Sequence, residues 1–392
     1  MLKQNAYFWG MKIKKLGISN FKSLVDFELV DLKSFCAFVG PNASGKSNIF
    51  EALEFTNYLI RYTNEAPNFF GGMQEIISFV DQPGRSKLSG DTISFTYSFD
   101  DKIEIGIHGN QYEDRYAFNG AHYEFDLDQS SLVNEVQEPY VTYGRQQGEF
   151  EKYLPFFEIN DPQKRKSFIS QWKKKGYQYA NDFEQFADNY SRIFVGKSAL
   201  NRIPATNTKL SADASNLSQI IGIIFENQIK RNDFIEWLRI LIPEFKNIEV
   251  KKSNIDGSYD FFIYEKGSKR PFSRNLISDG TYNILSLMAA VYQSNQPQFL
   301  CIEEPENGLH PQAIEFLVDF FREKSEGEGH HIWLNTHSQT LVRCLEIDEI
   351  ILINKVDGAT KAKQLTKDDE VNIKTDEAWL SNALGGGVLW SK

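Results

Sequence analysis

The sequence of 392 residues has little cysteine and no long hydrophobic run. Its three cysteines, Cys36, Cys301 and Cys344, lie far apart in apolar segments, which excludes a disulfide framework and the C-x-x-C spacing of a zinc site. The longest near-apolar stretches, 220–225 and 285–292, are far shorter than the roughly 20 residues of a membrane-spanning helix. The N-terminus has no basic-then-apolar signal. We therefore expect a soluble, cytoplasmic protein with no membrane partner.

Basic residues are also fewer than acidic ones. The chain has 43 Lys and Arg and 53 Asp and Glu, which gives a formal net charge of −10. A negative protein repels phosphate backbones at long range, so contact with a nucleic acid would need a local basic patch. Hydrophobic residues make up 41% of the chain, enough for a sizeable core, and the length predicts two or three structural units. Composition therefore favours a globular protein with a protein or nucleotide partner.

Hydrophobic periodicity predicts an α/β fold. The first strand pattern begins after Met11, the expected natural start, and strands continue to Val39 before a helical segment at 47–58. Alternation between Asp91 and Tyr143 predicts an antiparallel outer sheet. No stretch sustains the heptads of a long coiled coil. Later expected elements are helices from Asp161-Pro162, at 217–245, from Thr281 and from Gln312, and strands at 248–250, 261–264, 299–302, 332–335 and 350–353.

A phosphate-binding pattern, G-x-x-x-x-G-K-[ST], lies between the strand at 35–39 and the following helix. Its two glycines allow the backbone N–H groups to curl around an anion, and the helix N-terminus adds partial positive charge. Lys46 is expected to reach the terminal phosphates, and the Ser47 hydroxyl to ligate Mg²⁺. The pattern therefore predicts ATP and Mg²⁺ as cofactors, with these binding residues: Gly40, Pro41, Asn42, Ala43, Ser44, Gly45, Lys46, Ser47 and Asn48.

Two adjacent carboxylates, Glu303 and Glu304, end the apolar strand at 299–302. The carboxyl edge of a parallel sheet is where ligands bind, and neighbouring strand residues face opposite ways. One glutamate can address the Mg²⁺ shell while the other polarises an attacking water. The alternative is a solvated turn with two charges before Pro305.

With these motifs the chain resembles the compact ABC-type ATPases related to RecF, SMC proteins and the overcoming-lysogenization-defect nucleases, over residues 11–58 and 275–353. The resemblance implies an ABC-type P-loop head with a mixed sheet. It makes 303–311 the Walker B motif and D-loop, with Glu303 on the magnesium water shell and Glu304 as the general base. It makes His337 the switch histidine that senses the γ-phosphate, and places the element 20–23, with Lys22, beside the nucleotide.

The segment 277–281 resembles the ABC signature, which in this family caps the γ-phosphate held by a second protomer. By that resemblance Ser278 and Gly280 contact nucleotide in an ATP-bound head-to-tail homodimer, although Asp279 replaces a second glycine. Read without the family, Ser278 is a helix N-cap. Gln74 is the candidate for the metal-binding glutamine of the Q-loop.

The expected organisation is an ATPase head formed by 11–90 and 269–392, interrupted by an α+β lid at 91–268. Too few residues follow Ile353 for the Toprim nuclease of some relatives, so a separate effector such as a nuclease or toxin is expected. Asp126-Leu127-Asp128 fits the outer face of a strand better than a metal site. His330 and His331, near Gly327 and Gly329, predict a solvated loop.

One cluster of basic and aromatic residues stands out, comprising 164–166 and 173–175 with Phe168, Trp172 and Tyr177. It can be a solvated amphipathic helix, the interpretation that we favour, a docking surface for a protein, or a grip on a nucleic-acid strand. Two functions follow. The first is an ATPase switch that controls an effector in phage defence or DNA maintenance, as the resemblance implies; the second is a DNA-binding repair ATPase whose lid grips nucleic acid.

Overall fold

The computed structural model describes residues 13–78, 92–99, 103–112, 115–126, 131–142, 187–197, 202, 208–369 and 373–384. Contacts between residues divide the chain into two compact units. The first comprises Met1–Lys33, Pro41–Asp188 and Leu352–Gln364, and the second Ser34–Gly40, Asn189–Ile351 and Leu365–Lys392. The head and lid boundaries expected from the sequence, 11–90, 91–268 and 269–392, stay a prediction. Among the described residues, no helix is both long and apolar enough to cross a bilayer.

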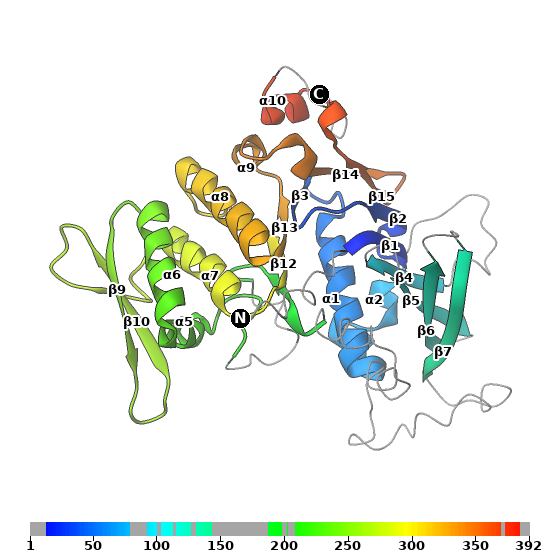
Figure 1. The fold of residues 1–392 in the computed structure, drawn as a ribbon, viewed down its shortest axis with the longest axis horizontal. Helices are drawn as coiled ribbons and strands as arrows, with labels where there is room; N and C mark the ends of the chain where they lie inside the picture. Colours follow the sequence, from blue (N-terminus) through cyan, green and yellow to red (C-terminus); the bar gives the residue numbers. More distant parts are fainter. Residues whose placement is uncertain are drawn as a thin grey trace, which may run out of the picture. The chain divides into compact units, whose positions relative to one another are not determined.

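The first unit contains an antiparallel sheet in the order β2-β1-β4-β5-β6-β7 (Figure 1). Side chains of β1 and β2 alternate between buried and less buried positions, so one face of this part of the sheet forms a core. The antiparallel strands expected between Asp91 and Tyr143 are therefore present. Their bounds are β1 (Ile13–Phe21), β2 (Leu24–Val30), β4 (Thr92–Phe99), β5 (Ile103–Tyr112), β6 (Arg115–Asp126) and β7 (Ser131–Thr142).

Helix α1 (Lys46–Tyr62) contributes to an aromatic core in this unit. The ring of Phe55 lies 5.7 Å from that of Phe21, 5.8 Å from that of Phe95 and 5.1 Å from that of Phe70, measured between centroids. Two short helices follow α1, η1 (Thr63–Phe70) and α2 (Met73–Ile76). Strand β15 (Ala359–Gln364) returns from the far end of the chain, and its Gln364 Oε1 accepts a hydrogen bond from Val30 N at 3.0 Å.

The second unit contains four parallel strands in the order β8-β12-β13-β3. Strand β12 is buried along its whole length and β13 from its second residue on, so their hydrophobic runs suit a sheet that is covered on both faces. Trp333 packs between Phe38 and Phe299, with centroid distances of 5.5 and 4.7 Å. The bounds are β3 (Phe35–Val39), β8 (Tyr190–Ile193), β12 (Phe299–Glu303) and β13 (His331–Thr336).

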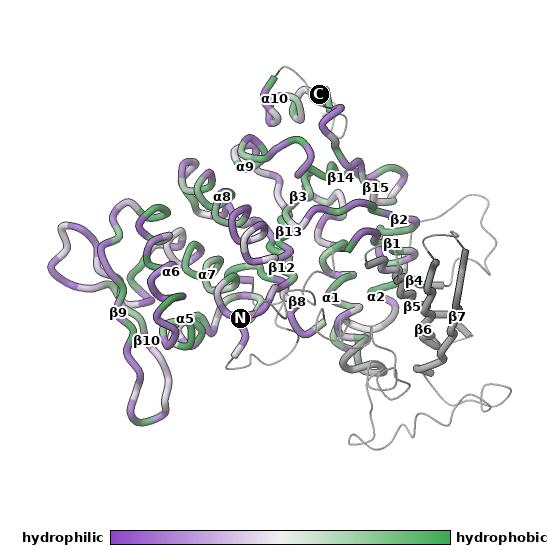
Figure 2. Tube along the Cα trace, viewed as in Figure 1, coloured by the Kyte–Doolittle hydropathy of each residue, from purple (hydrophilic) through white to green (hydrophobic). Residues whose placement is uncertain are grey.

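Helices and a small sheet complete the second unit. Helix α8 packs on β3 and β13, and α5, hydrophobic over most of its length, packs on α7 and on the sheet β11-β10-β9 (Figures 1 and 2). Strand β14 (Ile350–Val356) begins in this unit and continues into the first. The remaining bounds are α5 (Leu217–Glu226), α6 (Gln228–Leu241), β9 (Phe245–Lys252), β10 (Tyr259–Glu265), β11 (Phe272–Ser273), α7 (Asp279–Tyr292), α8 (Pro311–Glu328), α9 (Gln339–Arg343), η5 (Ile347–Glu349), η6 (Lys367–Asp369) and α10 (Thr375–Leu380).

The expectation of a solvated loop at His330 is wrong. Helix α8 ends at Glu328, and Gly329, with a φ of 71°, turns the chain so that β13 begins two residues later, at His331. His330 is buried, and its Nδ1 accepts a hydrogen bond from Gln298 N at 3.0 Å. Its Nε2 lies 3.3 Å from Glu328 Oε2, and this contact with His330 is the main cause that lowers the pKa of Glu328 to about 2.

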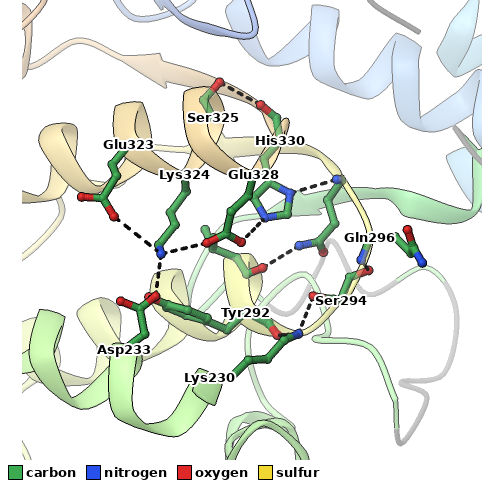
Figure 3. A network of polar contacts seen from close by, with 12 residues as sticks. Lys230, Asp233, Tyr292, Ser294, Gln296, Glu323, Lys324, Ser325, Glu328 and His330 are labelled. Atoms are coloured by element: carbon green, nitrogen blue, oxygen red, sulfur yellow. Dashed lines mark hydrogen bonds and ion pairs between the residues drawn. The ribbon is translucent and has the colours of Figure 1, made fainter. Parts of the chain in front are cut away.

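A polar network ties α6, α7 and α8 together (Figure 3). Asp233 Oδ2 accepts hydrogen bonds from Tyr292 Oη and from Lys324 Nζ, both at 2.6 Å. Burial lowers the pKa of Lys324, but its hydrogen bonds to Asp233 and Glu328 outweigh that effect and raise it. Lys230 Nζ donates to Tyr292 O at 2.7 Å, at the last residue of α7. The C-terminal end of α7 is thus fixed to its two neighbouring helices.

Two expected features fall partly or wholly outside the described residues. The helix start at Asp161-Pro162 and the whole basic cluster of 164–177 lie there. Of the Asp126-Leu127-Asp128 segment, only Asp126 is described, as the last residue of β6. In the part of the chain that the structure describes, no group of three or more His, Cys, Asp or Glu side chains could hold a metal ion by itself.

Candidate nucleotide-binding and hydrolysis site

The expected phosphate loop connects β3 to the start of α1 at Lys46. Ala43 has a φ of 62° and Gly45 one of 99°, left-handed conformations that curl the loop ahead of the helix N-terminus. A Cβ atom at position 45 would lie 1.9 Å from Thr360 Oγ1 and 2.7 Å from Ser23 Oγ. Only glycine fits there, for reasons of space as well as of backbone conformation.

Thr360 of β15 supports the phosphate loop through hydrogen bonds. Its buried hydroxyl donates to Ser44 O at 3.0 Å and lies 2.6 Å from Ser23 Oγ. Asn48 Nδ2 also donates to Ser23 Oγ, at 2.7 Å. The loop, the β1–β2 turn and β15 therefore share one hydrogen-bonded group. Sequence reasoning did not identify Thr360, because a threonine in a polar strand 316 residues from Ser44 carries no local signal.

The cations expected to bind nucleotide both have partners within the first unit. Lys46 is buried, and its Nζ donates to Pro41 O at 2.8 Å, so its ammonium group lies over the loop. Lys22 Nζ pairs with Glu51 Oε2 at 2.7 Å. The buried Ser44 Oγ has no hydrogen-bond partner among the described residues. An ammonium group, the Ser47 hydroxyl and the N-terminus of a 17-residue helix form a donor set that fits a nucleotide polyphosphate with Mg²⁺.

Gln74, the Q-loop candidate, lies exposed in α2. Two residues later Ile76 O accepts a hydrogen bond from Lys22 N at 2.7 Å, and Ser78 N donates to Asn20 O at 3.0 Å. The segment after Gln74 is therefore fixed to the β1–β2 turn, the same turn that supports the phosphate loop.

In the second unit, the parallel register brings the other motifs to one edge of the sheet. Glu303 is paired with Asn335, Asn335 with Phe38, and Thr336 with Val39. The strands β12, β13 and β3 thus end side by side, and the residues that follow them include Glu304, His337 and Gly40. The carboxyl edge of such a sheet is the usual ligand-binding position in open α/β folds.

Glu303 is buried and held by an arginine that sequence reasoning missed. Arg192 lies on β8 in register with Cys301, so its side chain is on the same face of the sheet as that of Glu303, two residues further along β12. Its Nε donates to Glu303 Oε1 at 2.7 Å, and Nη2 contacts the same oxygen. Asn335 Nδ2 approaches Oε2 at 3.4 Å. The available signal was an arginine between Tyr190 and the apolar pair Ile193-Phe194, because a buried cation requires a buried anion.

Glu304 has a different environment. Its φ of 48° is left-handed, and Glu304 N donates to Asn335 O at 2.8 Å, which fixes this unusual backbone. Glu304 Oε2 accepts from Asn307 Nδ2 at 3.0 Å, and Oε1 lies 3.6 Å from His337 Nδ1. The side chains of Glu304 and His337 are 30% and 42% exposed. A carboxylate and an imidazole therefore face each other where water can reach both.

A third carboxyl group of the motif, Glu306, is buried. Its Oε1 accepts a hydrogen bond from Thr336 Oγ1 at 2.5 Å, while its buried Oε2 has no hydrogen-bond partner in the part of the chain that the structure describes. Burial raises the pKa of Glu306, against the opposing effect of the Thr336 hydroxyl. The site thus combines one carboxylate paired with arginine, one that is open to water and one whose ionisation is disfavoured.

The signature-like segment and the loop after β12 are joined directly. Ser278 is exposed and caps α7, since its Oγ accepts from Thr281 N at 3.1 Å. Asn283 Nδ2 donates to Pro305 O at 3.0 Å and to Asn307 O at 2.8 Å. A Cβ atom on Gly280 would lie 2.5 Å from Gly308 O. The close contact with Gly308 within this chain therefore requires glycine at position 280, independently of any contact with a second protomer.

Comparisons with known proteins fit this geometry. The family described as "AAA domain, putative AbiEii toxin, Type IV TA system" matches residues 35–343. The chain is similar to the ATP/GTP phosphatase of Helicobacter pylori (strain ATCC 700392 / 26695), with 22% identity over 92% of this chain and 94% of that protein. It is also similar to chromosome partition protein Smc of Bacillus subtilis (strain 168), with 35% identity over 25% of this chain but only 8% of Smc.

A solved structure shows the fold. The Smc head domain with a coiled coil and joint derived from Pyrococcus yayanosii is similar with a TM-score of 0.51 and 13% identity, over 95% of this chain and 99% of that chain. The expected α/β fold of an SMC-like head domain is thereby confirmed. The longest helix in the described part of the chain, α8, has 18 residues.

Proposed function

Because this chain belongs to the AAA-domain family that matches residues 35–343 and is an ATPase, we propose that it is an ATP-dependent switch that controls a separate effector. In this proposal the phosphate loop binds ATP, the carboxyl edge of the parallel sheet hydrolyses it, and the signature segment meets a second protomer.

The phosphate loop holds the nucleotide through the residues from Gly40 to Asn48. Lys46 leaves Pro41 O and turns to the terminal phosphates, a small movement for a flexible side chain. When bound, magnesium would neutralise charge on the phosphates. Ser47, Glu303 and Gln74 are the residues that would hold it. Lys22, paired with Glu51, adds positive charge close to the loop.

The pair Glu304 and His337 is the observation that carries the hydrolytic role. Glu304 accepts a proton from the attacking water, because its carboxylate is partly exposed and its strained backbone is fixed by Asn335 O. His337 Nδ1, 3.6 Å from Glu304 Oε1, senses the γ-phosphate and orients the carboxylate. Glu303, buried against Arg192, is not placed to take up a proton from bulk water.

The exposed signature supports ATP-dependent dimerisation. Ser278 and Asp279 are exposed at the N-terminus of α7, which favours anions, so a second protomer's nucleotide can approach them. The link from Asn283 to Pro305 O and Asn307 O couples this surface to the hydrolytic loop. We propose a head-to-tail homodimer in which Ser278 and Gly280 cap the partner's nucleotide.

Replacing Glu304 by Gln tests this proposal, because it keeps the shape of the side chain and removes the base. We expect the Glu304→Gln protein to bind ATP, to lose hydrolysis by at least about 100-fold and to accumulate a dimer that light scattering detects. Glu326→Gln, an exposed change on α8, is the matched control. A Glu304→Gln protein that hydrolyses ATP at the normal rate, or that stays monomeric at saturating ATP, contradicts the mechanism.

The effector and the pathway rest on family resemblance. The resemblance to RecF-like and SMC-like heads implies that relatives of this size often act beside a nuclease or toxin in phage defence or DNA maintenance. The description of the matched family also contains a toxin system. The similarity to the ATP/GTP phosphatase supports nucleotide hydrolysis by this chain. We propose a cytoplasmic location. A pull-down of the protein with and without ATP identifies an effector that binds only one nucleotide state.

The alternative is a DNA-binding repair ATPase, favoured by the similarity to Smc proteins and by the basic cluster at 164–177. Binding to DNA at low and high salt decides between the two functions. A protein with no DNA affinity at low salt, or with unchanged affinity after replacement of Lys173, Lys174 and Lys175, is not such a module.

A further inference from the structure

Arg192 and Glu303 form a buried ion pair inside the proposed magnesium site. The two side chains are 4% and 2% exposed, and both Nε and Nη2 of Arg192 contact the same oxygen, Oε1. The two residues are 111 positions apart in the sequence and are brought together by the parallel pairing of β8 with β12. Neither the phosphate loop nor the hydrolytic pair needs an arginine at this position, so its presence requires a separate explanation.

The charge of Arg192 has a direct effect on a metal site. Water screens a buried pair little, so the guanidinium cancels most of the attraction that the Glu303 carboxylate would exert on a cation. A divalent ion approaching Glu303 also meets a positive charge a few ångströms behind it. The phosphates of a nucleotide supply negative charge that offsets this repulsion.

We propose that Arg192 makes magnesium binding at Glu303 dependent on nucleotide. It positions the carboxylate through Oε1 and neutralises it, so that Mg²⁺ binds together with ATP and not in its absence. The inference rests on the proposed role of Glu303 in the magnesium shell. Arg192 is a positioning residue, because it acts on the metal through Glu303.

The test measures binding, not turnover, with the full chain. A fluorescent ATP analogue is titrated at increasing Mg²⁺ concentrations, and Mg²⁺ alone is titrated by calorimetry. In Arg192→Gln, which keeps a hydrogen-bond donor but removes the charge, we expect half-maximal nucleotide binding at about tenfold lower Mg²⁺ and measurable binding of Mg²⁺ without nucleotide. Arg192→Lys keeps the charge and should resemble the wild type. An unchanged Mg²⁺ dependence in Arg192→Gln overturns the inference.

A second pair of variants covers the case in which Arg192→Gln does not fold, since it leaves a buried carboxylate unpaired. Glu303→Gln keeps the guanidinium and removes the anion, whereas the double variant Arg192→Gln, Glu303→Gln removes both charges. We expect the double variant to bind Mg²⁺ with nucleotide about tenfold more tightly than Glu303→Gln alone. Equal affinities, or weaker binding by the double variant, overturn the inference.

The same data separate this inference from the proposed function. If Glu303→Gln has the same Mg²⁺ dependence as the wild type, Glu303 has no role in the metal shell, and both fail. If Glu303→Gln weakens Mg²⁺-dependent binding but neither Arg192→Gln nor the double variant has the expected effect, the inference alone fails.

Discussion

The carbonyl oxygen of Gly308 lies against Gly280 so closely that a Cβ atom at position 280 would meet it at 2.5 Å. These two glycines join the signature segment to the loop after β12, and Asn283 strengthens the junction with hydrogen bonds to Pro305 O and Asn307 O. The proposed dimer surface and the proposed hydrolytic loop are therefore one structural element, and a change at their junction should affect both.

Gly280→Ala should damage this junction. The neighbouring group is backbone and cannot turn aside, so we expect a loss of about 1–3 kcal/mol in the free energy of unfolding, together with a loss of ATP-dependent dimerisation. Urea denaturation and light scattering measure the two effects. Gly327→Ala on α8 is the control, because no atom of the described residues lies within 4 Å of its Cβ position and alanine favours a helix by up to about 1 kcal/mol. Equal stability changes in the two variants would contradict the close contact.

Thr360→Val should weaken nucleotide binding, although Thr360 supports the phosphate loop and is not itself one of the expected binding residues. Valine keeps the shape but removes the hydroxyl that donates to Ser44 O and lies beside Ser23 Oγ. We expect a loss of about 1–2 kcal/mol in stability and several-fold weaker ATP binding, measured by denaturation and calorimetry. Thr366→Val, at an exposed hydrogen bond to Asp369, should change neither. Wild-type affinity in Thr360→Val would show that the loop keeps its shape without this support.

Lys46→Ala should remove most of the nucleotide affinity. The ammonium group is the cation expected to contact the terminal phosphates, and charge-assisted hydrogen bonds of this kind account for roughly 10- to 100-fold in affinity. Calorimetric titration with ATP measures the change, and Lys355→Ala, an exposed lysine of β14, is the control of equal charge. Retained affinity in Lys46→Ala would refute the assignment of the phosphate loop.

Glu306→Gln should change how stability depends on pH. Burial raises the pKa of Glu306 above its value in the unfolded chain, so its contribution to stability is complete below the unfolded pKa and is lost as the pH rises through the folded pKa. Glutamine does not ionise and keeps an acceptor for Thr336 Oγ1. The free energy of unfolding of the variant, relative to that of the wild type, should therefore increase as the pH rises from 4 to 8.

Denaturation at a series of pH values checks this expectation. Glu326→Gln, exposed on the same polypeptide, should give a curve parallel to that of the wild type. Parallel curves for Glu306→Gln as well would mean that Glu306 titrates as it does in the unfolded chain.

The parts of this protein that the sequence predicted depend on short stretches of chain. Three motifs could be recognised because the strand or helix that positions each of them is adjacent in the sequence. They are a glycine-rich loop after an apolar strand, two glutamates at a strand end and a serine before a helix. The strand and helix alternation from Phe299 to Ile353 could be predicted for the same reason, because buried parallel strands are nearly continuous hydrophobic runs.

The parts that could not be predicted depend on pairing between distant strands. Arg192 reaches Glu303 only because β8 is parallel to β12, and Thr360 reaches Ser44 across 316 residues. His330 was wrongly expected in a solvated loop, because neighbouring glycines are typical of loops. Its imidazole is instead buried. The Nδ1 atom accepts a hydrogen bond from Gln298 N, and the Nε2 atom contacts Glu328.

The support of the phosphate loop by Thr360 has a consequence for biosynthesis. A ribosome makes the loop among the first fifty residues, long before it reaches strand β15, and domains generally fold as units during synthesis. Until Thr360 emerges, Ser44 O and Ser23 Oγ lack the hydroxyl that joins them. On the proposed role of the loop, we expect the nascent chain to reach its full affinity for nucleotide only after β15 has been synthesised.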